Sequence, residues 1–271
     1  MRKTRFILPN AFTSMSFLLG TFSICWAAGI FSGSAKDPFR MSAYFTILCV
    51  LLDKLDGFAA RLVDASSEFG AQFDSLADLV AFGLAPAFAL FFHYKVCAPQ
   101  WLSDNLSLVM VVFSVYVLCA AMRLAKYNAM DSDMYHEFFS GLPSTFAGGL
   151  NVVFLTWMAD NGLFTTMNPK MMYIPLVMML LSGILMVSPF FLPKLQIRKN
   201  KIINAFQVVN IIAVYIAGFM FIAPKVPFTC EYMLLLMAGY IVIGFGYGFL
   251  KRAAILEEGK KAAEEAEEAK K

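Results

Sequence analysis

Four aspartates stand in two pairs within an otherwise apolar part of the sequence. Asp53 and Asp56 are three residues apart, and Asp74 and Asp78 are four residues apart. At about 100° per residue, each pair falls on one face of a helix. The short polar segment DASSEFGA between the pairs can form a turn. The pattern therefore predicts a helical hairpin whose two acidic faces converge.

These residue types favour a particular metal chemistry. Carboxylates without histidine or cysteine select Mg²⁺, Mn²⁺ or Ca²⁺ over zinc. Four carboxylates are more than one Mg²⁺ usually takes from a protein, so two ions are expected, and two-metal clusters serve in-line displacement at phosphorus. Gly57 and Ala60 lie on the face of the first pair, where their small size lets a substrate approach the backbone. Phosphate chemistry is the leading hypothesis.

Two other interpretations of the acidic cluster stay open. An ionised carboxylate at membrane depth costs several kcal/mol unless it is paired, hydrated or bound to a cation. Asp53 or Asp56 could form buried ion pairs with Lys54 or Arg61, although most of the carboxylates would then be left unpaired. The cluster could also belong to a cation-coupled transporter, but the acids gather near one end of their helices and the two halves of the chain show no convincing repeat.

The elements that must position these residues are membrane-spanning helices. The chain has 271 residues, of which 59% are hydrophobic and 15% charged, with a mean hydropathy of +0.67, far more apolar than a soluble domain. A membrane span needs about 20 mostly apolar residues in a helix, because lipid cannot satisfy backbone polar groups. Eight stretches qualify: 10–32, 41–63, 72–94, 105–127, 144–162, 171–191, 203–223 and 231–250. We expect an all-α polytopic membrane bundle.

The organisation of the chain is expected to be simple. No soluble domain interrupts the spans, so residues 1–252 are expected to form one transmembrane domain. Residues 253–271 form a low-complexity tail of Ala, Glu and Lys, typical of a solvated or frayed helix. Pro9 is expected to separate a basic N-terminal segment from the first span.

The distribution of lysine and arginine predicts the orientation. Cytoplasmic loops carry an excess of these residues. With the N-terminus inside, most basic residues lie on the cytoplasmic side, including Arg61, Arg123 and Lys126. Both termini and the acidic hairpin are therefore predicted to be cytoplasmic, where basic side chains suit anionic lipid headgroups. No nucleic-acid partner is expected.

Two further features have two interpretations each. Cys97 and Cys230 fall in predicted outward loops, where they could form a disulfide or remain thiols. The segment GFGYGF, at 244–249, offers small residues for close helix contact, either between two protomers or within one bundle.

The charged residues also carry a resemblance to a known family. They stand in the spacing D-x-x-D-G-x-x-A-R-x8-G-x-x-x-D-x-x-x-D, which is similar to the signature of the CDP-alcohol phosphatidyltransferases. The matching positions are Asp53, Asp56, Gly57, Ala60, Arg61, Gly70, Asp74 and Asp78. Four other stretches resemble the branch of CDP-diacylglycerol–serine O-phosphatidyltransferases: PNAFTSMSFLLG (9–20), SLADLVAFGLAPA (75–87), MRLAKYN (122–128) and FSGLP (139–143).

The resemblance implies an activity and a set of roles. The activity is transfer of a phosphatidyl group from CDP-diacylglycerol to serine with release of CMP, at the cytoplasmic face of the membrane. The four aspartates would hold Mg²⁺ or Mn²⁺, with Asp74 and Asp78 catalytic and Asp78 able to take the proton of the acceptor hydroxyl. The family also implies a homodimer. The nucleotide would be bordered by Asp56, Gly57, Ala60 and Arg61, and the carboxylate of serine would meet Arg123 and Lys126.

The sequence departs from the family pattern at three places. Lys126 stands where arginine is usual, and the runs PSTFA and SPFFLPK also differ from the usual ones. Lysine lacks the planar fork with which arginine binds a carboxylate or phosphate. Another acceptor, such as a glycerol phosphate or an inositol compound, is therefore the alternative within the family.

Overall fold

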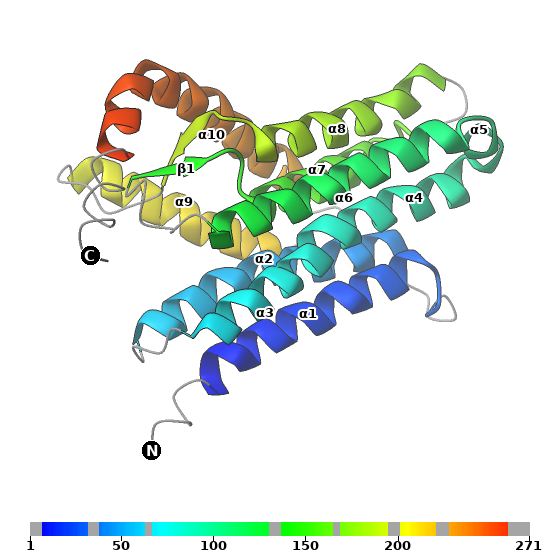
Figure 1. Cartoon of the computed structure of the whole chain (residues 1–271). Coiled ribbons are helices and arrows are strands. Elements are labelled where there is room, and N and C mark those ends of the chain that lie inside the picture. Colours follow the sequence, from blue (N-terminus) through cyan, green and yellow to red (C-terminus); the bar gives the residue numbers. More distant parts are fainter. Residues whose placement is uncertain are drawn as a thin grey trace.

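The computed structural model is a bundle of long helices with a two-stranded ribbon at one end (Figure 1). It describes residues 7–31, 38–62, 67–129, 137–164, 169–194, 201–220 and 228–259, without the side chains of residues 7–9, 54–62 and 201–208. The helices are α1 (Ile7–Ala27), α2 (Pro38–Leu62), α3 (Glu68–Asp78), α4 (Ala85–Cys97), α5 (Pro99–Asp104), α6 (Leu106–Ala129), α7 (Ser144–Asp160), α8 (Tyr173–Val187), α9 (Lys201–Met220) and α10 (Thr229–Leu250). The π-helix η2 (Leu79–Leu84) joins α3 to α4, and the 3-10 turn η3 (Pro169–Met172) precedes α8.

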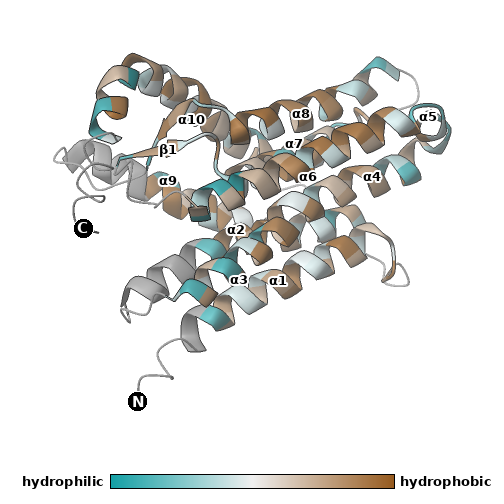
Figure 2. Ribbon diagram, in the orientation of Figure 1, coloured by the Kyte–Doolittle hydropathy of each residue, from teal (hydrophilic) through white to brown (hydrophobic). Residues whose placement is uncertain are grey.

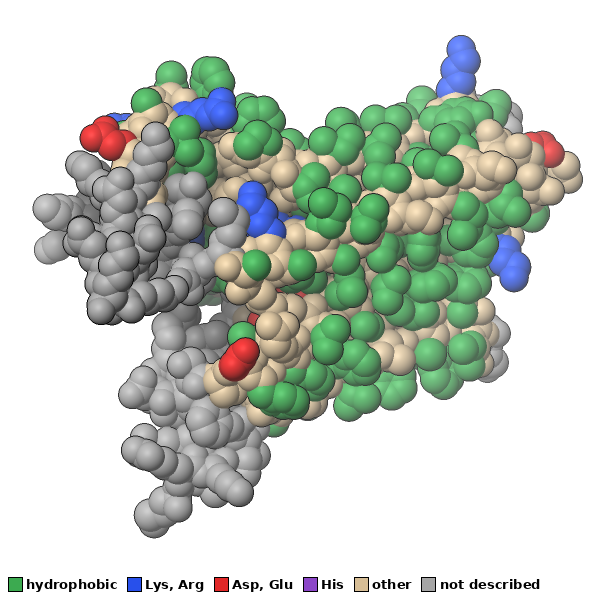
Figure 3. Space-filling view, viewed as in Figure 1, with side chains coloured by type: hydrophobic (Ala, Val, Ile, Leu, Met, Phe, Trp, Pro, Cys, Tyr) green, Lys and Arg blue, Asp and Glu red, His purple; other side chains and the backbone are tan. Residues whose placement is uncertain are grey.

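The protein is an all-α integral membrane protein. Within the described residues, four helical segments are long and apolar enough to cross a membrane: Glu68–Cys97, Leu106–Ala129, Pro169–Val187 and Thr229–Leu250. The other four predicted stretches also contain helices, which are α1, α2, α7 and α9. Apolar residues cover the sides of the helices, and charged side chains gather mainly toward the ends of the described surface (Figures 2 and 3). This distribution is that of a protein solvated by lipid.

Local sequence explains where several helices begin and end. Ser67 caps α3, because its hydroxyl accepts a hydrogen bond from the Gly70 amide at 3.0 Å. The helix α8 ends at Val187, before the predicted limit of 191, because Pro189 disfavours helical backbone at the residue before it.

The expectation that Pro9 separates the N-terminal segment from the first span was wrong. The helix α1 begins at Ile7 and includes Pro9, because the first turn of a helix tolerates a proline.

The third predicted span is not a uniform α-helix. Between α3 and α4 the backbone widens into η2, where the Ala85 amide donates to the carbonyl of Val80 five residues earlier. The buried Tyr116 of α6 donates its hydroxyl to the carbonyl of Phe82 at 2.7 Å. Segments of π-helix are rare and are often found at functional sites. Here the segment directly follows Asp78.

The core lies where α4, α6, α7 and α8 meet. Its largest fully buried side chains include Tyr94, Tyr116, Leu155, Met158 and Met179. The helix α7 packs closely on η2, because a Cβ atom added at Gly148 would lie 2.8 Å from Cβ and 2.9 Å from Cα of Phe82. Glycine at this position therefore permits the close approach of two backbones.

Gly148→Ala is expected to lower the stability of the folded protein by about 1–3 kcal/mol, since overpacking forces backbone shifts. Gly149→Ala is the matched control, because the added Cβ would meet only Val50 and Met237 side-chain atoms at 3.5 and 3.7 Å, an ordinary contact distance. Alanine also favours a helix more than glycine does, so the control should match or exceed the wild type. Thermal unfolding of both variants in the same detergent checks this. Equal melting temperatures would contradict it.

A short antiparallel ribbon, which the sequence did not predict, closes one end of the bundle. Strand β1 (Phe138–Ser140) pairs with β2 (Phe191–Pro193), so that Ser140 lies opposite Phe191. The following residue, Gly141, has φ +79°, and a Cβ atom there would lie 2.3 Å from the Met186 carbonyl oxygen. The amide of Gly141 donates to the carbonyl of Phe190 at 2.7 Å. The chain entering α7 is therefore attached to the end of α8.

The helix α10 supports this ribbon. Cβ atoms added at Gly244 and Gly248 would meet Leu192 Cδ1 at 2.7 Å and the Phe191 carbonyl oxygen at 1.9 Å. These two glycines of GFGYGF therefore serve packing within one chain. Ile255, in the segment expected to be a solvated tail, is buried beside Phe138 and Phe191. Packing on the ribbon thus extends past residue 252.

Candidate metal centre

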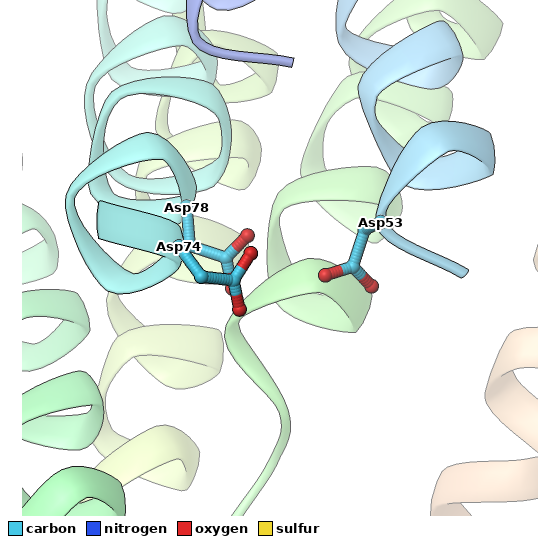
Figure 4. Close-up of side chains that lie close together, drawn as sticks. All are labelled: Asp53, Asp74 and Asp78. Carbon is cyan, nitrogen blue, oxygen red and sulfur yellow. The ribbon is translucent and has the colours of Figure 1, made fainter. Parts of the chain in front are cut away.

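Three of the four predicted aspartates converge at the end of the bundle that carries the ribbon. Asp53 comes from α2, whereas Asp74 and Asp78 come from α3. One carboxylate oxygen of each residue lies within 4.8 Å of the corresponding oxygens of the other two. Figure 4 shows the side chains of Asp74 and Asp78 directed across the space between the helices toward Asp53. Asp78 is buried, and the other two are partly buried.

Four other residues of the signature lie outside the described side chains. Asp56, Gly57, Ala60 and Arg61 belong to the helical backbone of α2, but the positions of their side chains are not described. The predicted nucleotide contacts therefore remain predictions. The same is true of ion pairs that would involve Lys54, Asp56 or Arg61.

The described carboxylates fit a divalent cation. Two oxygens on opposite sides of one Mg²⁺ are about 4.2 Å apart, so small side-chain rotations would bring oxygens now within 4.8 Å into its coordination shell. Two ionised carboxylates at 4.8 Å repel each other by about 3.5 kcal/mol at an effective dielectric constant of about 20. A cation bound between the carboxylates would attract each of them and offset this repulsion. The donor set is oxygen alone, as hard cations prefer.

A fourth side chain at this centre was missed in the sequence. Thr145, in the first turn of α7, donates its hydroxyl to Oδ2 of Asp53 at 3.2 Å. It lies in PSTFA, one of the runs that depart from the family pattern. That departure was the only signal available, because the approach of α7 to α2 is a long-range contact.

The two predicted acceptor residues have different surroundings. Arg123 is only 7% exposed, and its Nε–H has no hydrogen-bond partner in the described part of the chain. Its guanidinium carbon lies 5.1 Å from the centroid of the Tyr127 ring, and its charge interacts with that of Asp78. A buried cation therefore lies near the acidic cluster.

Lys126 points elsewhere. It is exposed, and its Nζ donates to Oγ of Ser140 in β1 at 3.0 Å. Nearby, the Asn128 side-chain amide donates to Oγ of Ser75 at 2.9 Å. The end of α6 is thus joined both to the ribbon and to α3, which carries Asp74 and Asp78.

The opposite end of the bundle carries no acidic group comparable to this one among the residues described. There, Arg40 of α2 forms a salt bridge with Asp160 of α7. Cys97 and Cys230 form no disulfide in the described structure, and Cys97 Sγ lies 3.6 Å from Nε2 of His93.

The helices suit a membrane, and three carboxylates that could hold a metal ion converge at one end of the bundle. These features are typical of a class of membrane enzymes with an acidic centre. Comparison with known protein families supports that class. The family model of the CDP-alcohol phosphatidyltransferases matches residues 6–192, which is more than half of the chain. The chain belongs to this family, and the resemblance found in its signature is confirmed.

Several curated relatives share one name, CDP-diacylglycerol–serine O-phosphatidyltransferase. A Helicobacter pylori protein is 32% identical over 193 residues, which cover 70% of this chain and 73% of the relative. A Mycobacterium bovis protein is 36% identical over 152 residues, covering 54% of this chain and 48% of the relative. A Methanocaldococcus jannaschii protein is 31% identical over 147 residues, covering 54% of this chain and 61% of the relative.

Proposed function

We propose that this protein transfers the phosphatidyl group of CDP-diacylglycerol to L-serine, giving phosphatidylserine and CMP. The convergence of Asp53, Asp74 and Asp78 carries the proposal, because it forms an oxygen-only centre suited to a diphosphate substrate. The family membership supports the reaction, and the name shared by the relatives supports serine as the acceptor.

The four aspartates of the signature would hold two Mg²⁺ or Mn²⁺ ions. Bound there, the ions would supply neutralisation of the diphosphate and of the charge that develops on departing CMP. The protein contributes the positions: Asp53 and Asp56 from α2, and Asp74 and Asp78 from α3. Gly57, Ala60 and Arg61 would border the nucleotide, with the arginine fork on a phosphate.

The reaction exchanges one phosphorus–oxygen bond for another. The hydroxyl oxygen of serine bonds to the phosphorus of the phosphatidyl group, and the bond from that phosphorus to the CMP oxygen breaks. We assign to Asp78 the removal of the hydroxyl proton, which a carboxylate within hydrogen-bond reach can accept. Its burial supports this role, because water is largely excluded around it.

Arg123 is the better candidate for binding the carboxylate of serine. Its buried guanidinium keeps an Nε–H donor without a described partner, and it lies close enough to Asp78 for their charges to interact. Lys126, bonded to Ser140 on the surface, would attract the anion before it enters.

Arg123→Gln is expected to raise the KM for serine at least about 10-fold, since a hydrogen bond to a charged group contributes about 1.5–3 kcal/mol. Lys126→Gln, three residues away on the same helix, should change it less than about 3-fold, because an exposed charge is screened. Steady-state kinetics at saturating CDP-diacylglycerol measure both values. Similar effects of the two variants would remove the distinction between a binding and a steering residue.

The membrane arrangement completes the proposal. Eight spans with both termini in the cytoplasm would put the aspartates at the cytoplasmic face, in line with the bias in lysine and arginine. The acyl chains of the substrate would then remain in lipid while the nucleotide meets the aspartates. We also propose one transmembrane domain over residues 1–252, followed by the charged segment, and a homodimeric assembly.

Purified protein supplied with CDP-diacylglycerol, Mn²⁺ or Mg²⁺ and a panel of acceptors tests the function. CMP release that depends on serine and on the divalent cation is the expected result. Release with a glycerol phosphate or an inositol compound in place of serine would assign another branch of the family. No CMP release with any acceptor would overturn the enzymatic proposal and favour cation transport.

A further inference from the structure

Thr145 lies where three parts of the structure meet at the acidic centre. Its side chain is buried, and its hydroxyl donates to Oδ2 of Asp53, which belongs to a different helix. Gly149, one turn further along α7, faces Val50 of α2, and Gly148 contacts Phe82 in η2. The first turns of α7 therefore contact both the helix that carries Asp53 and the segment that follows Asp78.

Among the described residues, the hydroxyl of Thr145 makes no hydrogen bond to a carbonyl of its own helix. A buried helical threonine commonly bonds the carbonyl four residues earlier, as Thr156 does with Val152 at 2.9 Å. The residue four before Thr145 is Gly141, which precedes α7 and has φ +79°. The bond to Asp53 across the helix interface replaces that local bond.

We propose that Thr145 is a positioning residue that holds the carboxylate of Asp53 in the orientation needed for a shared divalent cation. This inference rests on the proposed function. The terminal torsion of an aspartate is broad, so the carboxylate alone does not keep one orientation. A hydroxyl donor on one oxygen restricts that rotation and leaves lone pairs of the carboxylate available for the cation.

The backbone around Thr145 is itself well supported. The Gly141 amide donates to Phe190, and the Leu142 amide donates to Leu185 at 2.9 Å. These bonds attach the start of α7 to the end of α8. The donor is therefore presented from an anchored turn, as a side chain that orients a metal ligand must be.

Thr145→Val removes the hydroxyl and keeps the shape of the side chain, whereas Thr145→Ser keeps the hydroxyl. Thr156→Val is the matched control. It removes a buried hydroxyl from the same helix, and that hydroxyl donates to the backbone carbonyl of Val152. Electron paramagnetic resonance can follow Mn²⁺ binding to the purified full chain without substrate. We expect the dissociation constant of Thr145→Val to rise about 10-fold, with Thr145→Ser and Thr156→Val within about 2-fold of wild type.

In turnover, the Mn²⁺ concentration for half-maximal activity of Thr145→Val should rise by a similar factor. At saturating Mn²⁺, its kcat should approach that of the wild type. If Thr145→Val does not fold, Thr145→Ala removes the same hydroxyl and takes its place in both measurements.

Unchanged Mn²⁺ affinity in folded Thr145→Val would overturn the role of Thr145. Mn²⁺ binding weakened equally in Thr145→Ser and Thr145→Val would also overturn it, because serine keeps the hydroxyl and lacks only the methyl group. A wild-type protein that binds no Mn²⁺ would overturn both this role and the metal centre. Weaker binding in Thr145→Val combined with no CMP release by the wild type would support the positioning role and reject the transferase.

Discussion

Asp78→Asn is expected to reduce serine-dependent CMP release at least about 1,000-fold, which corresponds to about 4 kcal/mol in the activation free energy. The substitution keeps the shape of the side chain but removes its charge and its capacity to accept a proton. Asp78 is the most buried of the three convergent aspartates, so solvent cannot replace either contribution. Asp74→Asn should have a similar effect, because it removes one carboxylate from the same centre.

The folded protein should tolerate both changes. Carboxylates with oxygens within 4.8 Å repel one another, so neutralising one relieves repulsion in the metal-free protein. Thermal unfolding without divalent cation should give a melting temperature at or above that of the wild type for Asp74→Asn, and a smaller gain or none for Asp78→Asn, whose charge also interacts with that of the buried Arg123. Asp104→Asn is the control, because this exposed carboxylate lies on α5 at the other end of the bundle. Near-normal turnover in both Asp74→Asn and Asp78→Asn would remove the metal assignment.

Gly248→Ala is expected to destabilise the protein by about 3 kcal/mol or more, at the upper end of the range for overpacking. The added Cβ would lie 1.9 Å from the carbonyl oxygen of Phe191. Because that oxygen belongs to the backbone, no change of rotamer relieves the clash, and the ribbon or α10 must move. We expect a fall in the apparent melting temperature of the detergent-solubilised protein.

Gly246→Ala provides the control within the same motif. Gly246 is exposed, and a Cβ atom there would meet nothing within 4 Å in the described structure. Its melting temperature should match or exceed that of the wild type, because alanine favours a helix more than glycine does. If both variants melt alike, α10 does not depend on the ribbon for its packing. A change of oligomeric state in Gly246→Ala alone would instead place this face of α10 between protomers.

Gly248→Ala should also lower activity, through the ribbon. Strand β2 pairs with β1, which carries Ser140, and β1 leads through Gly141 into the turn of Thr145. Displacement of the ribbon would therefore shift the residue that contacts Asp53. The loss should appear as a weaker response to Mn²⁺ in the fraction that remains folded.

Much of the architecture followed from local patterns in the sequence. Runs of about 20 apolar residues must be helical in lipid, and helices occupy all eight predicted stretches. The spacing of Asp74 and Asp78 put them on one face of α3. The signature predicted the family because its residue types and intervals are specific. These features depend on residues within one or two helical turns of one another.

Other features depended on contacts between distant segments. A ribbon of three-residue strands has no recognisable periodicity, and its strands are separated along the chain by the whole of α7 and α8. The wide turn of η2 was hidden for the same reason, since the Tyr116 hydroxyl that bonds its Phe82 carbonyl comes from α6.

The roles of individual polar residues also required the tertiary structure. The sequence grouped Arg123 with Lys126, but burial separates them, one interacting with Asp78 and the other bonded to Ser140. Thr145 had no predicted role until α7 was placed against α2. The sequence by itself determined the helices, the family and the acidic residues of the signature, because local spacing and the lipid environment dictate them. Only the packing of the helices decided which side chains contact those residues, because that depends on which faces of distant helices meet.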